Sequence, residues 1–190
     1  MVMTGGADLP GTLRPVTKIA AGIGFAFAHF HVNGFDLLID PLGWYMCAIG
    51  LGQLRRSPTD PFGRAGTAAV TMACVSLVAL LSKGVRTSSL LENPLAHLSA
   101  FADTVGALIA VWLIVDAVLR RIRRSEAHAK LTLIDVLRWL MVGLGVLGLM
   151  DGYSPVDFGA EVDVAWFAAT AALVITLYSV ADRPCLVGYG

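Results

Sequence analysis

Six apolar stretches run through the chain, and the polar loops between them carry arginine mainly in every second loop. A membrane-spanning helix needs about 20 mostly apolar residues, because each residue adds about 1.5 Å along the axis. The stretches that approach this length lie near residues 17–33, 37–54, 66–83, 101–119, 132–150 and 162–180. The sequence therefore predicts an all-α polytopic membrane protein, a bundle of about six transmembrane helices paired into three hairpins.

The composition fits a chain that works in a bilayer rather than in water. Of the 190 residues, 56% are hydrophobic and only 15% are charged, whereas soluble domains have about a quarter charged residues. The formal net charge is +0, so no basic field points to nucleic acid as a partner. Cys47, Cys74 and Cys185 show no CxxC or Cys/His spacing. We therefore predict neither a metal site nor a cofactor.

Basic and acidic residues fall on opposite sides if the six helices alternate in direction. One side collects eleven basic residues, namely Arg14, Lys18, Arg55, Arg56, Arg64, Arg120, Arg121, Arg123, Arg124, Lys130 and Arg183. The other side carries only Lys83 and Arg86, together with most of the carboxylates. Lysine and arginine are retained in the cytoplasm, so both termini are expected there. The excess of arginine over lysine favours a bacterial source, and hence a bacterial cell membrane.

The expected organisation is one domain with two short tails. Residues 17–183 should form the six-helix transmembrane domain, with a mobile cytoplasmic tail at 1–16 and a second cytoplasmic tail at 184–190. The N-terminus also allows a second interpretation. A basic start, a short apolar run and the tripeptide Ala26-Phe27-Ala28 are similar to a signal peptide, so cleavage of residues 1–28 stays open.

The first hairpin carries the most distinctive motif of the chain. It reads Phe35-Asp36-Leu37-Leu38-Ile39-Asp40-Pro41-Leu42-Gly43-Trp44-Tyr45, followed by Gly50-Leu51-Gly52-Gln53-Leu54. This motif resembles one in small, uncharacterised bacterial polytopic membrane proteins, in which an Asp-Pro-x-Gly-aromatic hairpin leads into a helix. The resemblance covers about 20 residues. It implies a topology but no activity.

The residues of this motif predict a helix start at Asp40-Pro41. Proline fits the first turn of a helix because it has no N–H to leave unbonded, and aspartate is a good N-cap. A helix over 41–54 would be only roughly 20 Å long, too short to cross a membrane alone. Residues 35–40 therefore complete the crossing as helix, lie at the interface, or enter the membrane as irregular backbone.

Two groups of polar residues are candidates for chemistry. His29, His31, Asp36 and Asp40 gather at the outer end of the first hairpin. Histidine and carboxylate side chains serve as metal ligands, proton relays or contacts to a substrate, and they also occur as interfacial residues without such a role. On a helix, His29 and His31 would point about 200° apart, which makes them poor joint ligands.

The second group lies within the predicted spans. Arg138 is the only lysine or arginine away from the ends of a span, Asp135 precedes it by one turn, and Asp116 lies at a similar depth on the fourth span. An ion in the membrane costs at least about 2.5 kcal/mol on insertion scales. We expect an ion-pair cluster of Asp116, Asp135 and Arg138 that ties two helices together; anion or proton handling, or snorkelling of Arg138, are the alternatives.

Small residues at helix-packing spacing mark a candidate contact face at Ala20, Gly24 and Ala28. Such faces allow close approach within the bundle, to a membrane protein partner, or to a second copy in a homo-oligomer. The size, the topology and this face also resemble those of the substrate-binding components of energy-coupling vitamin transporters. That resemblance implies energising partners on other chains, because no nucleotide-binding motif is present here.

These observations lead to one functional expectation and one alternative. The first is a small-solute-binding or transport subunit whose outer pocket lies near the first hairpin. The alternative is a non-transporting assembly, immunity or scaffold protein that acts through helix contacts. The sequence has no P-loop, no GxSxG elbow and no HExxH motif, so it indicates no enzymatic activity and no catalytic residues. The lipid bilayer is the one partner that the composition implies directly.

Overall fold

The fold is helical throughout, apart from one short ladder. The computed structural model describes residues 13–27, 31–32, 35–36, 40–57, 59–85, 94–123, 128–151, 159–181 and 186. Within these ranges the helices are α1 (Pro15–Phe27), α2 (Asp40–Leu54), α3 (Pro61–Val85), α4 (Pro94–Ile122), α5 (His128–Asp151) and α6 (Gly159–Val180). The two strands are β1 (His31–Val32) and β2 (Phe35–Asp36), paired antiparallel. The predicted all-α polytopic class is confirmed.

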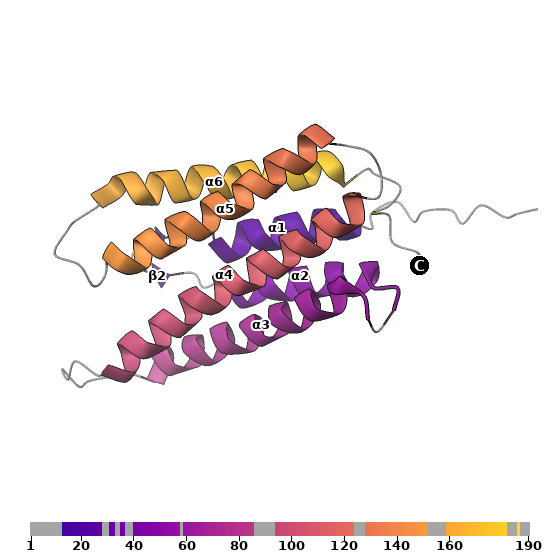
Figure 1. Ribbon diagram of the computed structural model, residues 1–190. Coiled ribbons are helices and arrows are strands. Elements are labelled where there is room, and N and C mark those ends of the chain that lie inside the picture. The colour runs from indigo at the N-terminus through magenta and orange to yellow at the C-terminus, as the bar shows by residue number, and fades with distance from the viewer. Residues whose placement is uncertain are drawn as a thin grey trace, which may run out of the picture.

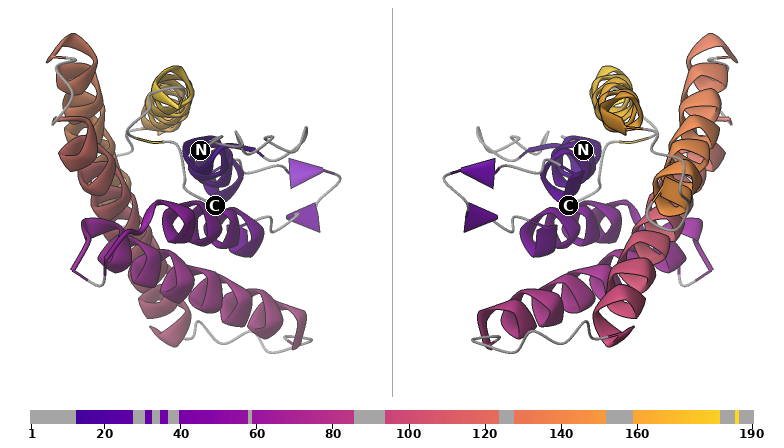
Figure 2. Two further views of the ribbon diagram at one scale, coloured as in Figure 1. Left: turned by 90° about the vertical axis from the view of Figure 1, so that its right-hand side faces the viewer. Right: turned by 90° about the vertical axis from the view of Figure 1, so that its left-hand side faces the viewer.

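The six helices form a closed ring. Each helix packs against the next one along the chain, and α6 packs against α1. Seen along the bundle, α6, α1, α2 and α3 follow one another in a row, while α4 and α5 cross beside that row (Figure 2). Helix α1 begins and α6 finishes at the same end of the bundle, on the right in Figure 1.

Alternating helix directions bring like charges to the same end of the bundle. The end at which α1 begins, called here the basic end, carries Arg14, Lys18, Arg55, Arg56, Arg64, Arg120, Arg121 and Arg123. The opposite end, called the acidic end, carries Asp40, Asp103, Glu161 and Asp163. The β1–β2 ladder belongs to the acidic end, because it joins the last residue of α1 to the first residue of α2.

Four helices are long and apolar enough to cross a membrane. The spans are Pro61–Leu80, Phe101–Ile122, Leu131–Met150 and Glu161–Val180. Many of their large apolar side chains are exposed on the outside of the bundle, among them Val78, Val136, Val164 and Ile175. Water-soluble monomers rarely expose apolar surface on this scale, whereas lipid covers it without cost.

Helices α1 and α2 are shorter than the predicted spans 17–33 and 37–54. They have 13 and 15 residues, or about 20 and 22 Å of helix. The prediction of helix is wrong at 31–32, which are extended and pair with residues 35–36, with Val32 opposite Phe35. Of the alternatives left open for 35–40, residues 35–36 are extended rather than helical. The signal that was missed is the sequence Asn33-Gly34 between the strands, since Asn-Gly is the most typical dipeptide of two-residue hairpin loops. The predicted helix start at Asp40-Pro41 is confirmed.

Close backbone contact joins α1 to α2. A Cβ atom added at Gly43 would lie 2.6 Å from the Ala26 amide nitrogen and 2.6 Å from the Gly22 carbonyl oxygen. A Cβ atom at Gly50 would lie 2.5 Å from the Pro15 carbonyl oxygen. Between these two glycines, the Cys47 thiol donates a hydrogen bond of 3.5 Å to the Ile19 carbonyl. Glycine is required along this seam because any side chain would meet the backbone of the other helix.

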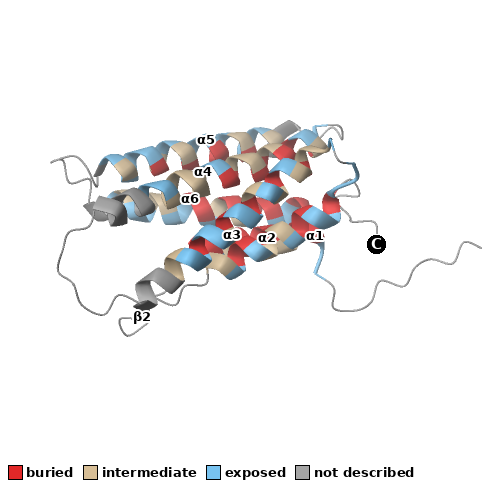
Figure 3. Ribbon diagram, turned by 90° about the horizontal axis from the view of Figure 1, so that it is seen from below, coloured by how far each residue is buried: buried red, intermediate tan, exposed pale blue. Residues whose placement is uncertain are grey.

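The packed core fills only part of the bundle. Among the described side chains of α4 and α6, the first buried ones are Ala110 and Ala169, and from there buried positions recur toward the basic end. On α5 the last position described as buried is Gly145. Figure 3 shows the buried segments concentrated toward the end where α1 begins. The described parts of α4, α5 and α6 are therefore more tightly packed toward the basic end, whereas Phe27 of α1 and Trp44 of α2 are buried near the acidic end.

The seam predicts opposite effects for two alanine substitutions on the same helix. Gly43→Ala should destabilise the protein by about 1–3 kcal/mol, because its Cβ would press on the α1 backbone. Gly52→Ala should be neutral or stabilise by up to about 1 kcal/mol, because nothing lies within 4 Å of its Cβ and alanine favours helix over glycine. Thermal unfolding in mild detergent measures both effects. An unchanged melting temperature for Gly43→Ala would contradict the backbone contact.

Candidate functional site

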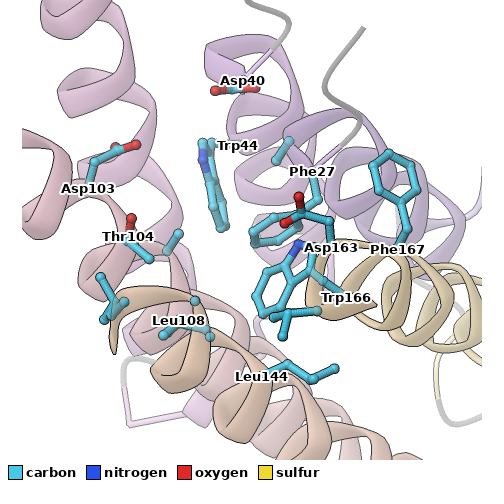
Figure 4. Close-up of a pocket in the computed structure, with 16 residues that line it drawn as sticks. Phe27, Asp40, Trp44, Asp103, Thr104, Leu108, Leu144, Asp163, Trp166 and Phe167 are labelled. Atoms are coloured by element: carbon cyan, nitrogen blue, oxygen red, sulfur yellow. The ribbon is translucent and has the colours of Figure 1, made fainter. Parts of the chain in front are cut away.

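A cavity of about 510 Å³ lies at the acidic end, among residues of five helices. Its described lining residues belong to α1, α2, α4, α5 and α6. The lining residues are Ala26, Phe27, Asp40, Trp44, Asp103, Thr104, Ala107, Leu108, Leu144, Gly145, Gly148, Leu149, Val162, Asp163, Trp166 and Phe167. The cavity thus occupies the part of the bundle that the packed core leaves unfilled, and Figure 4 shows its walls.

Three aromatic rings from three helices make one wall of the cavity. Phe27 is the last residue of α1, Trp44 lies early in α2 and Trp166 lies early in α6. The Phe27 ring packs edge-on against both indoles, with centroids 5.9 Å from Trp44 and 5.5 Å from Trp166. Edge-to-face packing holds these rings in fixed orientations. Gly43, the residue before Trp44, contacts the α1 backbone at Gly22 and Ala26. The α1–α2 seam therefore places Trp44 beside Phe27, the residue that follows Ala26.

Three carboxylates are spaced around the cavity. Asp40 comes from the start of α2, Asp103 from α4 and Asp163 from α6 (Figure 4). Asp40 and Asp103 are half-buried, and Asp163 is exposed. No lysine, arginine or histidine is among the described residues that line the cavity. The described lining is therefore mostly apolar and aromatic, with three carboxylates and Thr104 as its polar side chains.

Two glycines of α5, Gly145 and Gly148, belong to the cavity wall and have different surroundings. A Cβ atom at Gly148 would meet nothing within 4 Å, whereas one at Gly145 would lie 2.6 Å from a Leu108 methyl group. Gly145 thus lets α5 approach α4, and Gly148 leaves space within the cavity. Side chains at position 148 would extend into that space without straining the helix.

The predicted outer site of His29, His31, Asp36 and Asp40 is only partly described. Asp40 lines the cavity. The ladder register sets the backbone of His31 opposite that of Asp36, but their side chains, and all of His29, lie outside the described residues. Across the described part of the chain, no three His, Cys, Asp or Glu side chains converge as metal ligands would.

Sequence reasoning missed most residues of the cavity. The sequence indicates for Asp103 and Asp163 only a place among the carboxylates of one side, and for Trp44 only a position in the first-hairpin motif. The signal that joins them is positional, because each of these residues lies near the same end of its helix. Phe27 and Trp166 had no such signal, since an aromatic residue in an apolar span is unremarkable by pattern.

Asp116, Asp135 and Arg138 are brought together by α4 and α5. The Arg138 guanidinium donates a hydrogen bond of 3.2 Å to Asp116 Oδ1, and its other amino group lies 2.6 Å from Asp135 Oδ1. The guanidinium also lies over the Trp112 ring, 3.9 Å from the centroid. Asp116 accepts a second bond, of 2.7 Å, from Arg120. None of these residues lines the cavity, so this ion-pair cluster connects helices at a distance from it.

A second ion pair closes the basic end. Arg121 of α4 donates bonds of 2.7 Å to Asp60 Oδ2 and 3.2 Å to the Leu54 carbonyl at the end of α2. Asp60 in turn accepts a bond of 3.3 Å from the Phe62 amide in the first turn of α3. The Arg121 guanidinium lies 4.9 Å from the centroid of the Phe62 ring. One arginine thereby links α4 to the ends of both α2 and α3.

The predicted contact face of Ala20, Gly24 and Ala28 lies partly inside the bundle. Ala20 is fully buried. The nearest atom to an added Cβ at Gly24 would be a methyl of Val174 on α6, at 3.9 Å, so Gly24 faces α6 with room to spare. Ala28 lies outside the described residues. The glycine of α1 that makes close backbone contact with another helix is Gly22, in the α1–α2 seam.

No protein-family model, curated protein or solved structure matches this chain. Its function is therefore inferred from its own residues.

The ion-pair cluster predicts non-additive losses of stability. Arg138→Leu should destabilise the protein by about 2–3 kcal/mol, because it leaves two carboxylates without their shared cation. Asp116→Asn should destabilise less, and the double variant should lose less than the sum of the two. Arg123→Leu serves as the control. Arg123 is exposed in the turn that follows α4, so its replacement should change the free energy of unfolding by less than about 0.5 kcal/mol. If the stability losses of Arg138→Leu and Asp116→Asn are fully additive in thermal unfolding, the ion pair between Arg138 and Asp116 is ruled out.

Proposed function

We propose that this chain is a multi-pass protein of a bacterial cell membrane that binds a small solute in the acidic-end cavity. The observation that carries this proposal is the cavity itself, which draws its walls from five helices. Its volume of about 510 Å³ is within the range of about 300–1,000 Å³ that is usual for ligand pockets. Apolar walls with a few polar groups are also the usual lining of such pockets.

Packing beneath the cavity favours binding over open passage. Ile23, Ile114 and Leu173 are fully buried, and they belong to the core that fills the bundle between the cavity and the basic end. A solute that enters from the acidic end therefore meets packed side chains. Movement to the other side would need the helices to rearrange. As a transport subunit, the chain would rely on a partner protein for energy.

The charge distribution supports an outward-facing cavity. Arginine and lysine residues gather at the end opposite the cavity, and such residues are retained in the cytoplasm. Both termini of the described bundle lie at that basic end. The solute would then be taken from outside the cell.

Cysteine labelling tests this orientation. Thr59→Cys places a thiol in the exposed loop of the basic end, and Glu161→Cys places one at the acidic end; Cys74 and Cys185 are replaced in both. In right-side-out vesicles, a membrane-impermeant maleimide should label Glu161→Cys at once and Thr59→Cys only after permeabilisation, since basic loops stay inside. The reverse pattern would mean that the cavity faces the cytoplasm.

Two leucine substitutions on α5 test the cavity as a binding site. A library of small solutes is screened for those that raise the melting temperature of the purified protein, because a ligand at 100 times its Kd stabilises by about 2.7 kcal/mol. Gly148→Leu should abolish the response, since its side chain would occupy the cavity. Gly143→Leu should keep it, because Gly143 also has nothing within 4 Å of its Cβ but does not line the cavity.

Retained binding in Gly148→Leu would place the solute elsewhere. A screen in which no solute raises the melting temperature would favour the alternative function, a protein that acts through helix contacts with a membrane partner.

A further inference from the structure

We propose that the cavity selects solutes built on a flat aromatic ring, of one ring or two fused rings, over saturated solutes of the same size. This inference rests on the proposed function and names the class of solute. It is argued from the aromatic side chains that gather at the cavity, the fixed orientation of their rings, and the room beside them.

Aromatic side chains gather at the cavity from three helices. Phe27 of α1, Trp44 of α2, and Trp166 and Phe167 of α6 are all among its lining residues. Aromatic residues make up 8% of the chain but four of the 16 described lining residues. The lining is therefore enriched in aromatic rings, and the packing of the helices, rather than a local run of sequence, brings them together.

Contacts among these rings hold them in fixed orientations. The Phe27 ring meets the Trp44 ring at 76° and the Trp166 ring at 71°. Phe27 and Trp44 are buried, whereas Trp166 is half-buried, and Figure 4 shows the Trp166 ring directed into the cavity beside Phe27. Little side-chain freedom is lost when a solute packs against rings that are already held in place.

A ring of the solute can extend this edge-to-face cluster. Aromatic rings attract one another beyond the apolar area that they bury, by a factor of about two to ten in affinity for each pair. They do so in offset-stacked or edge-to-face arrangements, with centroids about 4.5–7 Å apart. A saturated ring has similar bulk but no π-electrons, so it gains only from the area that it buries.

The bilayer makes the ring contacts decisive for selectivity. Acyl chains are as apolar as leucine side chains, so an apolar solute gains little by leaving lipid for Leu108 and Leu144. Ring–ring contact is an interaction that acyl chains do not offer. The aromatic residues of the lining therefore determine which apolar solutes prefer the cavity to the membrane.

The cavity has room for a flat solute beside the aromatic wall. An apolar cavity of about 150 Å³ holds one benzene molecule, and this cavity has a volume of about 510 Å³. Gly148 contributes no side chain to the lining, and a Cβ atom there would meet nothing within 4 Å. The volume therefore accommodates two fused rings with a short substituent.

Two probes with the same carbon skeleton test this selectivity. One is β-naphthylmethanol, and the other is its fully saturated decahydro analogue. Each probe is dialysed to equilibrium against the protein in phosphatidylcholine nanodiscs and against empty nanodiscs, and the bound probe is measured by mass spectrometry. The empty nanodiscs correct for partition of each probe into lipid. We expect the protein to bind the aromatic probe about tenfold more tightly than the saturated one, as two ring pairs would provide.

Ring-removing variants assign the preference to the cavity. Trp166→Leu should reduce the ratio of the two affinities about threefold or more, because a ring contact is lost, and should leave the affinity for the saturated probe unchanged. Phe167→Leu, at a lining residue that is 52% exposed, should act in the same direction and carries the comparison if Trp166→Leu fails to fold. Trp139→Leu is the matched control, because Trp139 is 59% exposed and does not line the cavity. Its affinity ratio should equal that of the wild type.

The outcomes separate this inference from the proposed function. Equal or tighter binding of the saturated probe, or a preference that persists in both Trp166→Leu and Phe167→Leu, would overturn the aromatic selectivity. It would also be overturned if the screen finds only solutes without an aromatic ring, bound by the wild type and not by Gly148→Leu; the solute site would then stand. If no solute of any kind binds, the proposed function itself fails.

Discussion

Backbone contact between α1 and α2 is the interaction on which the rest of the molecule depends. Lipid provides little hydrophobic drive for helices to associate, so membrane helices rely on close packing. Gly22, Gly43 and Gly50 let the two shortest helices meet without side chains between them. This contact sets Phe27 beside Trp44, and through α6 and α3 the pair supports the remaining helices of the ring. The aromatic wall of the cavity is a consequence of this seam.

The two ends of the bundle differ in how their helices are connected and packed. At the basic end, Arg121 joins α4 to the α2–α3 connection through Asp60 and the Leu54 carbonyl, and apolar side chains fill the core. At the acidic end, the cavity lies among residues of five helices. A bundle closed at one end keeps its geometry while the other end stays open to a ligand. The position of the cavity therefore follows from where packing is complete.

The sequence predicts some of this organisation and not the rest, for physical reasons. Hydropathy and the positions of arginine predict six helices and their alternation, because lipid acts on each segment separately. The Asp40-Pro41 start is predicted because capping is local. The extended residues at 31–32 were missed, since the apolar pattern of the first predicted span runs through them. The close contact at Gly22 could not be predicted, because it depends on Gly43, a residue of another helix. The cavity residues Phe27 and Trp166 come together only through the ring of helices.

Charges inside this apolar bundle are used in two ways. An isolated ion is costly in a membrane, so carboxylates within spans need cations or access to water. Asp116 and Asp135 receive theirs from Arg138, within the chain, and the result is a link between α4 and α5. Asp40, Asp103 and Asp163 lie near the acidic ends of their helices and line the cavity; at the ends of membrane helices, water is closest to a charged group. Carboxylates within the bundle are therefore tied to an arginine, whereas those near the acidic helix ends line the cavity.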